Sequence, residues 1–171
     1  MKYGDIKGVD VANGPGVRVS LFVSGCRLNC KNCFNKAAQS FSFGTDYTQE
    51  TEDHIIDLLS RHYIQGLSLL GGDPMEPENQ PYILKLIKRV REELPDKDIW
   101  MWTGRTYPDD FQEGCKEYVN NITDEIFKNV DVVVDGRFIQ DLFTKKIKYR
   151  GSTNQRVLFL EHGTGNILDI K

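Results

Sequence analysis

Three of the four cysteines in this 171-residue chain lie in one short stretch, GCRLNCKNCFN, at positions 25–35. Cys26, Cys30 and Cys33 follow the spacing C-x3-C-x2-C. Thiolates are soft ligands that select zinc, copper(I) and iron–sulfur clusters. Three thiols are an odd number for disulfides, and a closed tetrahedral metal site needs one ligand more. The chemistry of the stretch therefore depends on what occupies the fourth position.

A zinc site completed by Cys115 or by a histidine is one interpretation. Zinc ligands usually come in two pairs, but here Cys115 is isolated and His54, His62 and His162 are scattered along the chain. The other interpretation is a [4Fe–4S] cluster held by three thiolates. A fully ligated electron carrier uses four cysteines, so three would leave one iron open to a substrate, as a catalytic zinc keeps an open position.

Composition is that of one soluble globular domain, with 39% hydrophobic and 27% charged residues. The formal net charge of −3 gives no whole-chain reason to expect nucleic acid or an anionic membrane as a partner. The first residues lack the apolar core of a signal peptide, and no apolar run approaches the ~20 residues of a membrane span. We therefore expect a cytoplasmic protein, in which clustered cysteines bind metal or take part in redox chemistry.

The elements that must position these cysteines alternate between strand and helix patterns. Apolar runs predict strands at 17–24, 66–72, 98–104, 130–136 and 156–162, and apolar stripes predict helices at 49–63, 79–95 and around 121–129. Such alternation implies right-handed crossovers and a mainly parallel sheet. The chain is too short for an eight-unit barrel, so we expect an α/β fold with an open or partial parallel (β/α) barrel.

Four of the predicted strands end in SGC, GGD, WTG and DGR. In open α/β sheets, ligands bind in loops at the carboxyl ends of the strands, so these four segments should share one rim. Gly-Gly-Asp-Pro at 71–74 would by itself indicate a turn. Beside a cysteine loop, its glycines would admit a ligand to the backbone and Asp73 could receive an ammonium group. Phe34 would either pack into the core or face a ligand.

The spacing C-x3-C-x2-C after a strand resembles the signature of the radical S-adenosylmethionine (SAM) enzymes. This resemblance implies a [4Fe–4S] cluster held by Cys26, Cys30 and Cys33, whose open iron chelates SAM. One electron then cleaves SAM into methionine and a 5′-deoxyadenosyl radical. The resemblance also implies a radical SAM barrel that spans residues 1–171 as a single domain. It implies no catalytic side chain beyond the cluster and cofactor.

The remaining site residues also rest on this resemblance. GGDP looks like the Gly-Gly-Glu segment that contacts the SAM amino group in the family, with Asp73 in place of the usual glutamate. Either the Asp73 side chain or the Gly72 backbone would make that contact. An aromatic residue commonly lies between or just after the last two cysteines, near the adenine. We therefore expect Asn32, Cys33 and Phe34 to belong to the cofactor shell.

Further segments extend the resemblance over nearly the whole chain. NGPGVR, SGC, GGDP, DIWMWTG, DGRFIQDL and RGSTNQR occur in one order. Together they resemble the small glycyl-radical activases of the radical SAM family, in particular those that serve the anaerobic ribonucleoside-triphosphate reductase. The implied reaction removes a hydrogen atom from a glycine Cα of that reductase, with an electron from a low-potential donor. A chain without a second cysteine cluster or an extra domain suits a protein substrate that closes the site itself.

Three alternatives remain open. The chain could activate another glycyl-radical enzyme such as pyruvate formate-lyase, or act on a small molecule, as in deazapurine synthesis. In a different class, it could be a metal-binding or iron–sulfur protein without catalysis. Formation of 5′-deoxyadenosine from SAM would separate the enzymes from the binding protein.

Charged and polar residues near the carboxyl end have two interpretations each. Taken singly, each would lie in a solvated loop or form a structural ion pair. As a set on the rim, some of them would position SAM or the partner. These residues are Asp135, Arg137, Asp141, Arg150, Asn154 and Arg156. The run KKIKYR at 145–150 indicates a solvated surface or, alternatively, a docking site for an acidic partner.

Overall fold

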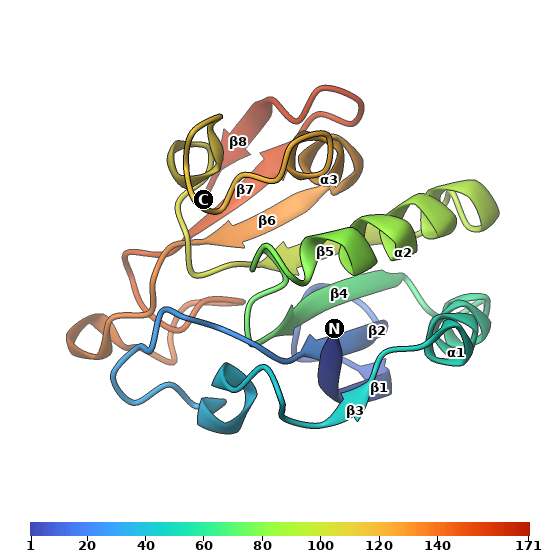
Figure 1. The fold of residues 1–171 in the computed structure, drawn as a ribbon, viewed down its shortest axis with the longest axis horizontal. Coiled ribbons are helices and arrows are strands. Elements are labelled where there is room, and N and C mark those ends of the chain that lie inside the picture. Colours follow the sequence, from blue (N-terminus) through green and yellow to red (C-terminus); the bar gives the residue numbers. More distant parts are fainter.

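A computed structural model describes residues 1–171 of the chain (Figure 1). Its strands are β1 (Lys2–Asp10), β2 (Arg18–Val23), β3 (Thr45–Asp46), β4 (Gly66–Gly71), β5 (Asp98–Trp102), β6 (Val132–Asp135), β7 (Arg156–Leu160) and β8 (Ile167–Ile170). Its helices are α1 (Gln49–Leu59), α2 (Gln80–Glu93) and α3 (Thr123–Asn129). The strands form one eight-stranded sheet in the order β3-β1-β2-β4-β5-β6-β7-β8.

The sheet is parallel in the middle and antiparallel at both edges. β2, β4, β5 and β6 are parallel to one another, and α1, α2 and α3 lie in the three connections between them. β1 and β3 at one edge, and β7 and β8 at the other, pair antiparallel. The expected open or partial parallel (β/α) barrel is therefore wrong. After β6 the chain returns through a loop to an antiparallel strand, so the helix-linked parallel repeat that a barrel requires stops there.

The sequence predicted the middle of this sheet and its three helices, with shifts at the element ends. α1 begins with a capping box between Thr48 and Thr51 and ends at Leu59, four residues before the predicted end at position 63. α2 has a proline in its first turn, where its missing N–H costs nothing, and buries Ile83, Ile87 and Val90. β1, β3 and β8 were not predicted.

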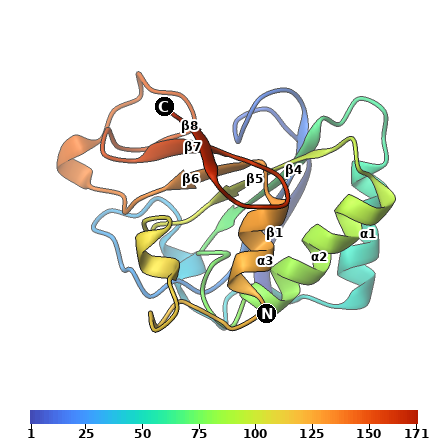
Figure 2. The ribbon, with the colours of Figure 1, turned by 90° about the horizontal axis from the view of Figure 1, so that it is seen from above.

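The two faces of the sheet are covered differently. The three helices pack on one face (Figure 2), over the larger core. Because side chains alternate along a strand, Ile99 and Met101 of β5 join that core, whereas Trp100 packs with Val132 and Val157 in a smaller cluster on the other face. No helix is long and apolar enough to cross a membrane.

Two irregular segments cover the face opposite the helices. One is the loop between β1 and β2, whose Asn13 carbonyl accepts a hydrogen bond of 2.6 Å from Ser68 Oγ of β4. The other is residues 136–155 between β6 and β7, which we call the arm. Trp102 Nε1 of β5 donates to the Tyr149 carbonyl of the arm at 2.8 Å. A space between the sheet and these segments is thus enclosed by loops and not by helices.

Candidate functional site

A cavity of about 570 Å³ opens where the cysteine loop, the ends of β4 and β5, and the arm meet. Cys26, Cys30 and Cys33 all line it, as do Asn32 and Phe34. The glycine-rich ends of the next two strands also reach it, at residues 70–72 and 102–104. The structure therefore brings the predicted thiols and two of the predicted glycine loops together in one place.

Two left-handed turns shape the cysteine loop. Asn29 has φ of 47° and Asn32 has φ of 55°, a region that asparagine adopts more readily than most residues. Each asparagine directly precedes a cysteine, and the Cys33 amide donates to the Cys30 carbonyl at 3.2 Å. These turns bend the chain back on itself, so that all three thiols line the same cavity.

The donor set fits an iron–sulfur cluster better than a single metal ion. All four cysteines are free, but no three His, Cys, Asp or Glu side chains converge closely enough to hold one ion. Cys115 does not line the cavity, and its Sγ lies 3.5 Å from the Asp109 carbonyl. The zinc site completed by Cys115 or a histidine is therefore not formed. Three thiols spread along one cavity match the ligands of an iron–sulfur cluster.

Cys26 is partly buried. Burial raises its pKa to about 12, and the nearby carboxylates of Asp73 and Glu76 act in the same direction. Only a thiolate binds metal, so iron must displace the Cys26 proton when it binds.

Gly72 fastens the loop after β4 to the start of the cysteine loop. Its amide donates to the Val23 carbonyl at 2.7 Å, and the next amide, of Asp73, donates to the Gly25 carbonyl at 2.8 Å. A Cβ on Gly72 would lie 2.5 Å from the Gly25 oxygen and 2.7 Å from the Ala38 oxygen. Glycine is thus required here by the approach of two backbones, in addition to any contact with a ligand.

Asp73 is fully buried and does not line the cavity. Its Oδ1 accepts from the Met75 amide at 2.9 Å. Its Oδ2 accepts at 3.0 Å from Thr103 Oγ1, from the Gly104 amide and from Arg105 Nη1. Burial raises the pKa of Asp73, while the Arg105 guanidinium and these donors oppose the rise. The Asp73 carboxylate, one of the two groups predicted to contact SAM, is therefore engaged inside the protein, between the loops that follow β4 and β5.

A buried charge network extends from Asp73, and no local pattern of residues predicted it. It consists of Asp73, Glu76, Arg105 and Glu117, all of them buried. Arg105 pairs with Asp73 at 3.0 Å, with Glu76 at 2.9 Å and with Glu117 at 3.0 Å. A charge of this kind is tolerated in the interior only when it is paired.

Glu76 connects this network to the cysteine loop. Its Oε1 accepts from the Arg27 amide at 2.7 Å, and its Oε2 accepts from Arg27 Nη1 at 2.6 Å. Arg27 directly follows Cys26, and its guanidinium also pairs with the exposed Glu78. One buried carboxylate therefore fixes the position of the first cysteine relative to the loops after β4 and β5.

Comparison with known proteins supports an iron–sulfur function. A family described as "4Fe-4S single cluster domain" matches residues 12–158. The anaerobic ribonucleoside-triphosphate reductase-activating protein of Vibrio cholerae is 47% identical over 159 residues, which cover 91% of this chain and 96% of the relative. This chain belongs to the family of these activating proteins. Proteins of the same name from Escherichia coli and Enterobacteria phage T4 are also similar to this chain. The first is 43% identical, over 92% of this chain and 97% of the relative, and the second is 41% identical, over 92% and 93%.

In this member of the activating-protein family, the arm closes the cavity from the side of β6. Arg137 Nη2 donates to the Leu28 carbonyl of the cysteine loop at 2.5 Å, and Asn154 Nδ2 donates to the Arg137 carbonyl at 2.8 Å. Asp135 and Arg156 form an ion pair of 2.5 Å at the base of the arm. These four residues have structural partners, as the simpler interpretation of the sequence predicted.

Of the six polar residues singled out near the carboxyl end, Arg150 and Asp141 remain, and only one of them reaches the cavity. Arg150 lines the cavity, although its Nη1 donates to the Gln155 carbonyl at 3.1 Å. Asp141 is exposed on the arm. Neither the sequence nor these contacts assign a ligand to either residue.

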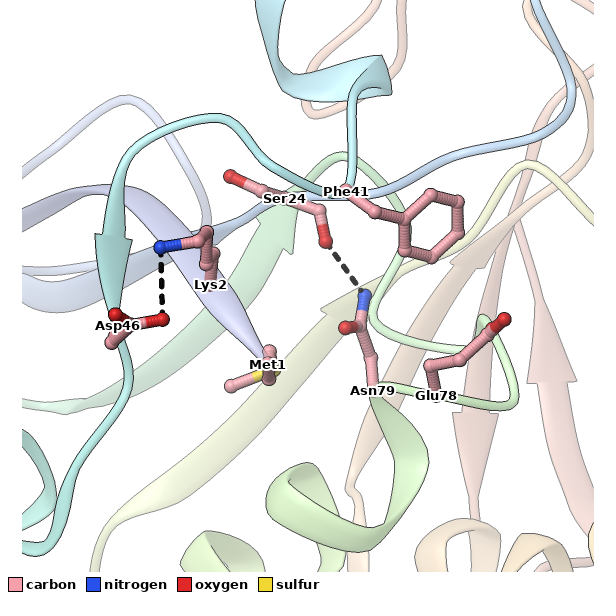
Figure 3. A pocket seen from close by; sticks show the side chains of 7 residues that line it. All are labelled: Met1, Lys2, Ser24, Phe41, Asp46, Glu78 and Asn79. Atoms are coloured by element: carbon pink, nitrogen blue, oxygen red, sulfur yellow. Dashed lines mark hydrogen bonds and ion pairs between the residues drawn. The ribbon is translucent and has the colours of Figure 1, made fainter.

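A smaller cavity of about 270 Å³ lies behind the cysteine loop of this activating-protein relative (Figure 3). Its polar groups are largely paired with one another: Lys2 with Asp46 at 2.8 Å, and Asn79 Nδ2 with the Ser24 carbonyl at 3.0 Å. Asn79 Nδ2 also donates to the Asp73 carbonyl at 2.9 Å. No cysteine lines this smaller cavity, and we assign its side chains to the support of the loops around the larger cavity.

Proposed function

We propose that this chain activates an anaerobic ribonucleoside-triphosphate reductase by generating a glycyl radical on it, with a [4Fe–4S] cluster and SAM as cofactors. One observation carries the proposal. All three loop thiols line one cavity in a chain that is similar to these activating proteins over 91% of its length. The proposal treats residues 1–171 as one radical SAM domain.

Cys26, Cys30 and Cys33 would hold the cluster, and one iron would have no thiolate because Cys115 lies outside the cavity. When bound, the cluster and SAM supply a 5′-deoxyadenosyl radical that takes a hydrogen atom from the substrate. The protein contributes binding, orientation and exclusion of water. No side chain of the chain needs to act as a catalytic acid or base.

SAM would bind beside the three thiols, against Asn32, Cys33, Phe34 and Gly72, which line the same cavity. Asp73 would support these residues without contacting SAM itself. Its carboxylate binds the Gly104 amide and Arg105, so it orients the two glycine loops that face the cofactor. The proposal therefore gives the Gly72 backbone the direct contact and gives Asp73 a supporting position.

Side chains on the face opposite the helices would keep water away from the reacting groups. Leu70 and Trp102 line the cavity from the sheet, and Phe138, Phe143 and Tyr149 line it from the arm. Apolar walls of this kind protect a reactive intermediate from solvent. The substrate would be a glycine-bearing loop of the reductase, and a low-potential electron donor would reduce the cluster.

Metal analysis tests the first half of the proposal. Protein reconstituted without oxygen should carry about four irons and four sulfides per chain. Replacing Cys26, Cys30 or Cys33 by alanine should abolish the intact cluster, whereas the control Cys115→Ala should retain it. A tightly bound zinc ion, or a cluster that requires Cys115, would show that the chain is a different kind of metal protein.

Radical transfer tests the second half. With SAM and dithionite, the chain should produce a glycyl radical on the anaerobic reductase from the same organism, seen as a doublet by electron paramagnetic resonance. A reductase made with deuterated glycine should transfer deuterium into 5′-deoxyadenosine. Transfer only to pyruvate formate-lyase, or only from a small molecule, would replace the proposal by the corresponding alternative.

A further inference from the structure

Five lysines beside the cavity form no ion pair. Lys31 and Lys36 lie on or just after the cysteine loop, and Lys145, Lys146 and Lys148 lie on the arm. All five are exposed, and none comes within 4.0 Å of a carboxylate. We call these five residues the basic rim.

The three lysines of α2 and α3 are paired. Lys85 lies 3.5 Å from Glu52, and Lys88 and Lys128 lie 3.6 and 3.2 Å from Glu125. The arm alone carries five basic residues and one acidic residue in a chain whose net charge is −3. The rest of the chain is therefore net acidic, whereas the arm beside the cavity is net positive. Such asymmetry attracts a partner of opposite charge to one face.

Apolar side chains accompany the basic rim. Ile139 is 41% exposed, Leu142 is 41% exposed and Phe143 is 48% exposed, all on the arm. Exposed apolar residues next to cations are characteristic of a surface that buries against another protein. A surface that binds nucleic acid relies mainly on cations that contact phosphates. The exposed apolar residues here, and the net negative charge of the whole chain, therefore favour a protein partner.

The basic rim borders the cavity that holds the thiols. The arm contributes Phe143 and Tyr149 to its lining, and the cysteine loop is tied to the arm through Arg137 and the Leu28 carbonyl. Figures 1 and 2 both show the cysteine loop and the arm on the same side of the molecule, away from α1 and α2. A protein that binds there would place one of its loops at the cavity entrance.

We propose that the basic rim, with Ile139, Leu142 and Phe143, is the docking surface for the reductase, and that it binds an acidic and apolar segment of that protein. This inference rests on the proposed function, since it names the surface through which the substrate protein arrives. The lysines would speed association by long-range attraction, and the apolar side chains would slow dissociation by burial.

Matched charge variants test the docking surface. The arm variant carries Lys145→Gln, Lys146→Gln and Lys148→Gln. The control variant carries Lys85→Gln, Lys88→Gln and Lys128→Gln, which removes the same charge from the helical side. Each is reconstituted with its cluster, and its Kd and association rate for the reductase are measured without oxygen at several salt concentrations.

The arm variant should bind the reductase about tenfold more weakly at low salt, mainly through slower association, and should lose most of the salt dependence. The control variant should stay within about twofold of the unmodified protein. SAM cleavage in the absence of the reductase should be the same in all three. Leu142→Ser should speed dissociation at every salt concentration, because it removes buried apolar contact.

The outcomes separate the two proposals. If the unmodified chain generates the glycyl radical but the arm and control variants bind the reductase equally well, the docking surface is wrong and the function stands. If the unmodified chain neither binds the reductase nor generates the radical, the proposed function fails and this inference fails with it. If a single-stranded oligonucleotide binds through the arm lysines as tightly as the reductase does, the surface belongs to nucleic acid and the inference is overturned.

Discussion

Two groups of charged side chains adjoin the cavity, and the protein treats them in opposite ways. Asp73, Glu76, Arg105 and Glu117 are buried, and every one of them has a charged partner within 3.0 Å. The lysines of the basic rim are exposed and have no charged partner. Charged side chains therefore form a closed, paired network on the inside and an open, unpaired surface at the entrance.

The difference follows from the cost of removing charge from water. An unpaired ion in the interior costs several kcal/mol, so a buried network persists only if each member is paired in one geometry. That requirement fixes the loops that carry the network. An exposed lysine costs nothing when left unpaired, and its attraction remains available to a partner. We therefore expect the buried network to determine the geometry of the site and the rim to determine what reaches it.

Glu76→Gln should have the largest effect. The amide group cannot accept from the Arg27 amide, the Arg27 guanidinium and Arg105 together, so one buried donor loses its partner. We expect a loss of about 3 kcal/mol in the free energy of unfolding of the metal-free protein, measured by urea denaturation under reducing conditions. Iron content after reconstitution should also fall, because Arg27 would no longer hold the cysteine loop in place.

Glu78→Gln is the matched control for that change. Glu78 pairs with the same guanidinium but is 52% exposed at its side chain, so its loss should cost less than about 1 kcal/mol and leave the iron content unchanged. Equal effects of the two substitutions would mean that burial of the network has no special importance for the site.

Gly72→Ala should have the next largest effect. The added methyl group would press on the Gly25 and Ala38 carbonyls, and the backbone would have to shift at a cost of about 1–3 kcal/mol. Because Gly25 begins the cysteine loop, we expect iron content and SAM affinity to fall together. If Gly72 served only to contact SAM, SAM affinity would fall while the cluster stayed intact, so iron analysis and SAM binding on one preparation distinguish the two explanations.

Gly163→Ala controls for loss of stability in general. Gly163 has φ of 87° and nothing within 4 Å of the added Cβ, so alanine there should cost about 1–2 kcal/mol through backbone strain alone. Its iron content and SAM affinity should stay normal. A similar loss of iron in Gly163→Ala would show that the cluster responds to stability and not to the contact at Gly72.

The parts of the site that could be predicted from the sequence are those encoded locally. The cysteine spacing and the glycines after each strand stand in consecutive residues, so the three thiols and the loops at 70–72 and 102–104 could be expected around one cavity. Apolar periodicity likewise predicted the parallel strands and the three helices. The barrel was an extension of that alternation beyond β6, where no helix follows.

The buried network could not be predicted, because its partners are distant in sequence. Glu76 meets Arg27 across 49 residues and Arg105 across 29, and no local pattern records such pairs. Asp73 was considered as a contact for SAM for the same reason: its donors Thr103 and Gly104 come from the loop after β5. β1 was missed because KYGDIKGVD, rich in charge and glycine, pairs through its backbone at the edge of the hydrophobic core.

Phe34→Ser should have the smallest effect, and it tests whether Phe34 serves the SAM-binding cavity or the docking surface. Phe34 is 91% exposed yet lines the cavity, so its removal should change the free energy of unfolding by less than about 0.5 kcal/mol. If its ring stacks on the adenine of SAM, as we expect, the Kd for SAM should rise about fivefold, since stacking on a base is worth about 1 kcal/mol or more. Equilibrium dialysis of the reconstituted protein measures this, and Tyr63→Ser, an exposed aromatic outside the cavity, should leave the Kd unchanged.

A different result would assign Phe34 to the docking surface and not to the SAM-binding cavity. If SAM binds normally to Phe34→Ser but the reductase binds more weakly, the ring belongs with the arm as part of the docking surface. In that case the cavity would present its aromatic side chain to the protein substrate, and the cofactor would depend on backbone and thiolate contacts alone. Measuring both affinities on the same variant decides between these assignments, because the substitution is too exposed to act through the fold.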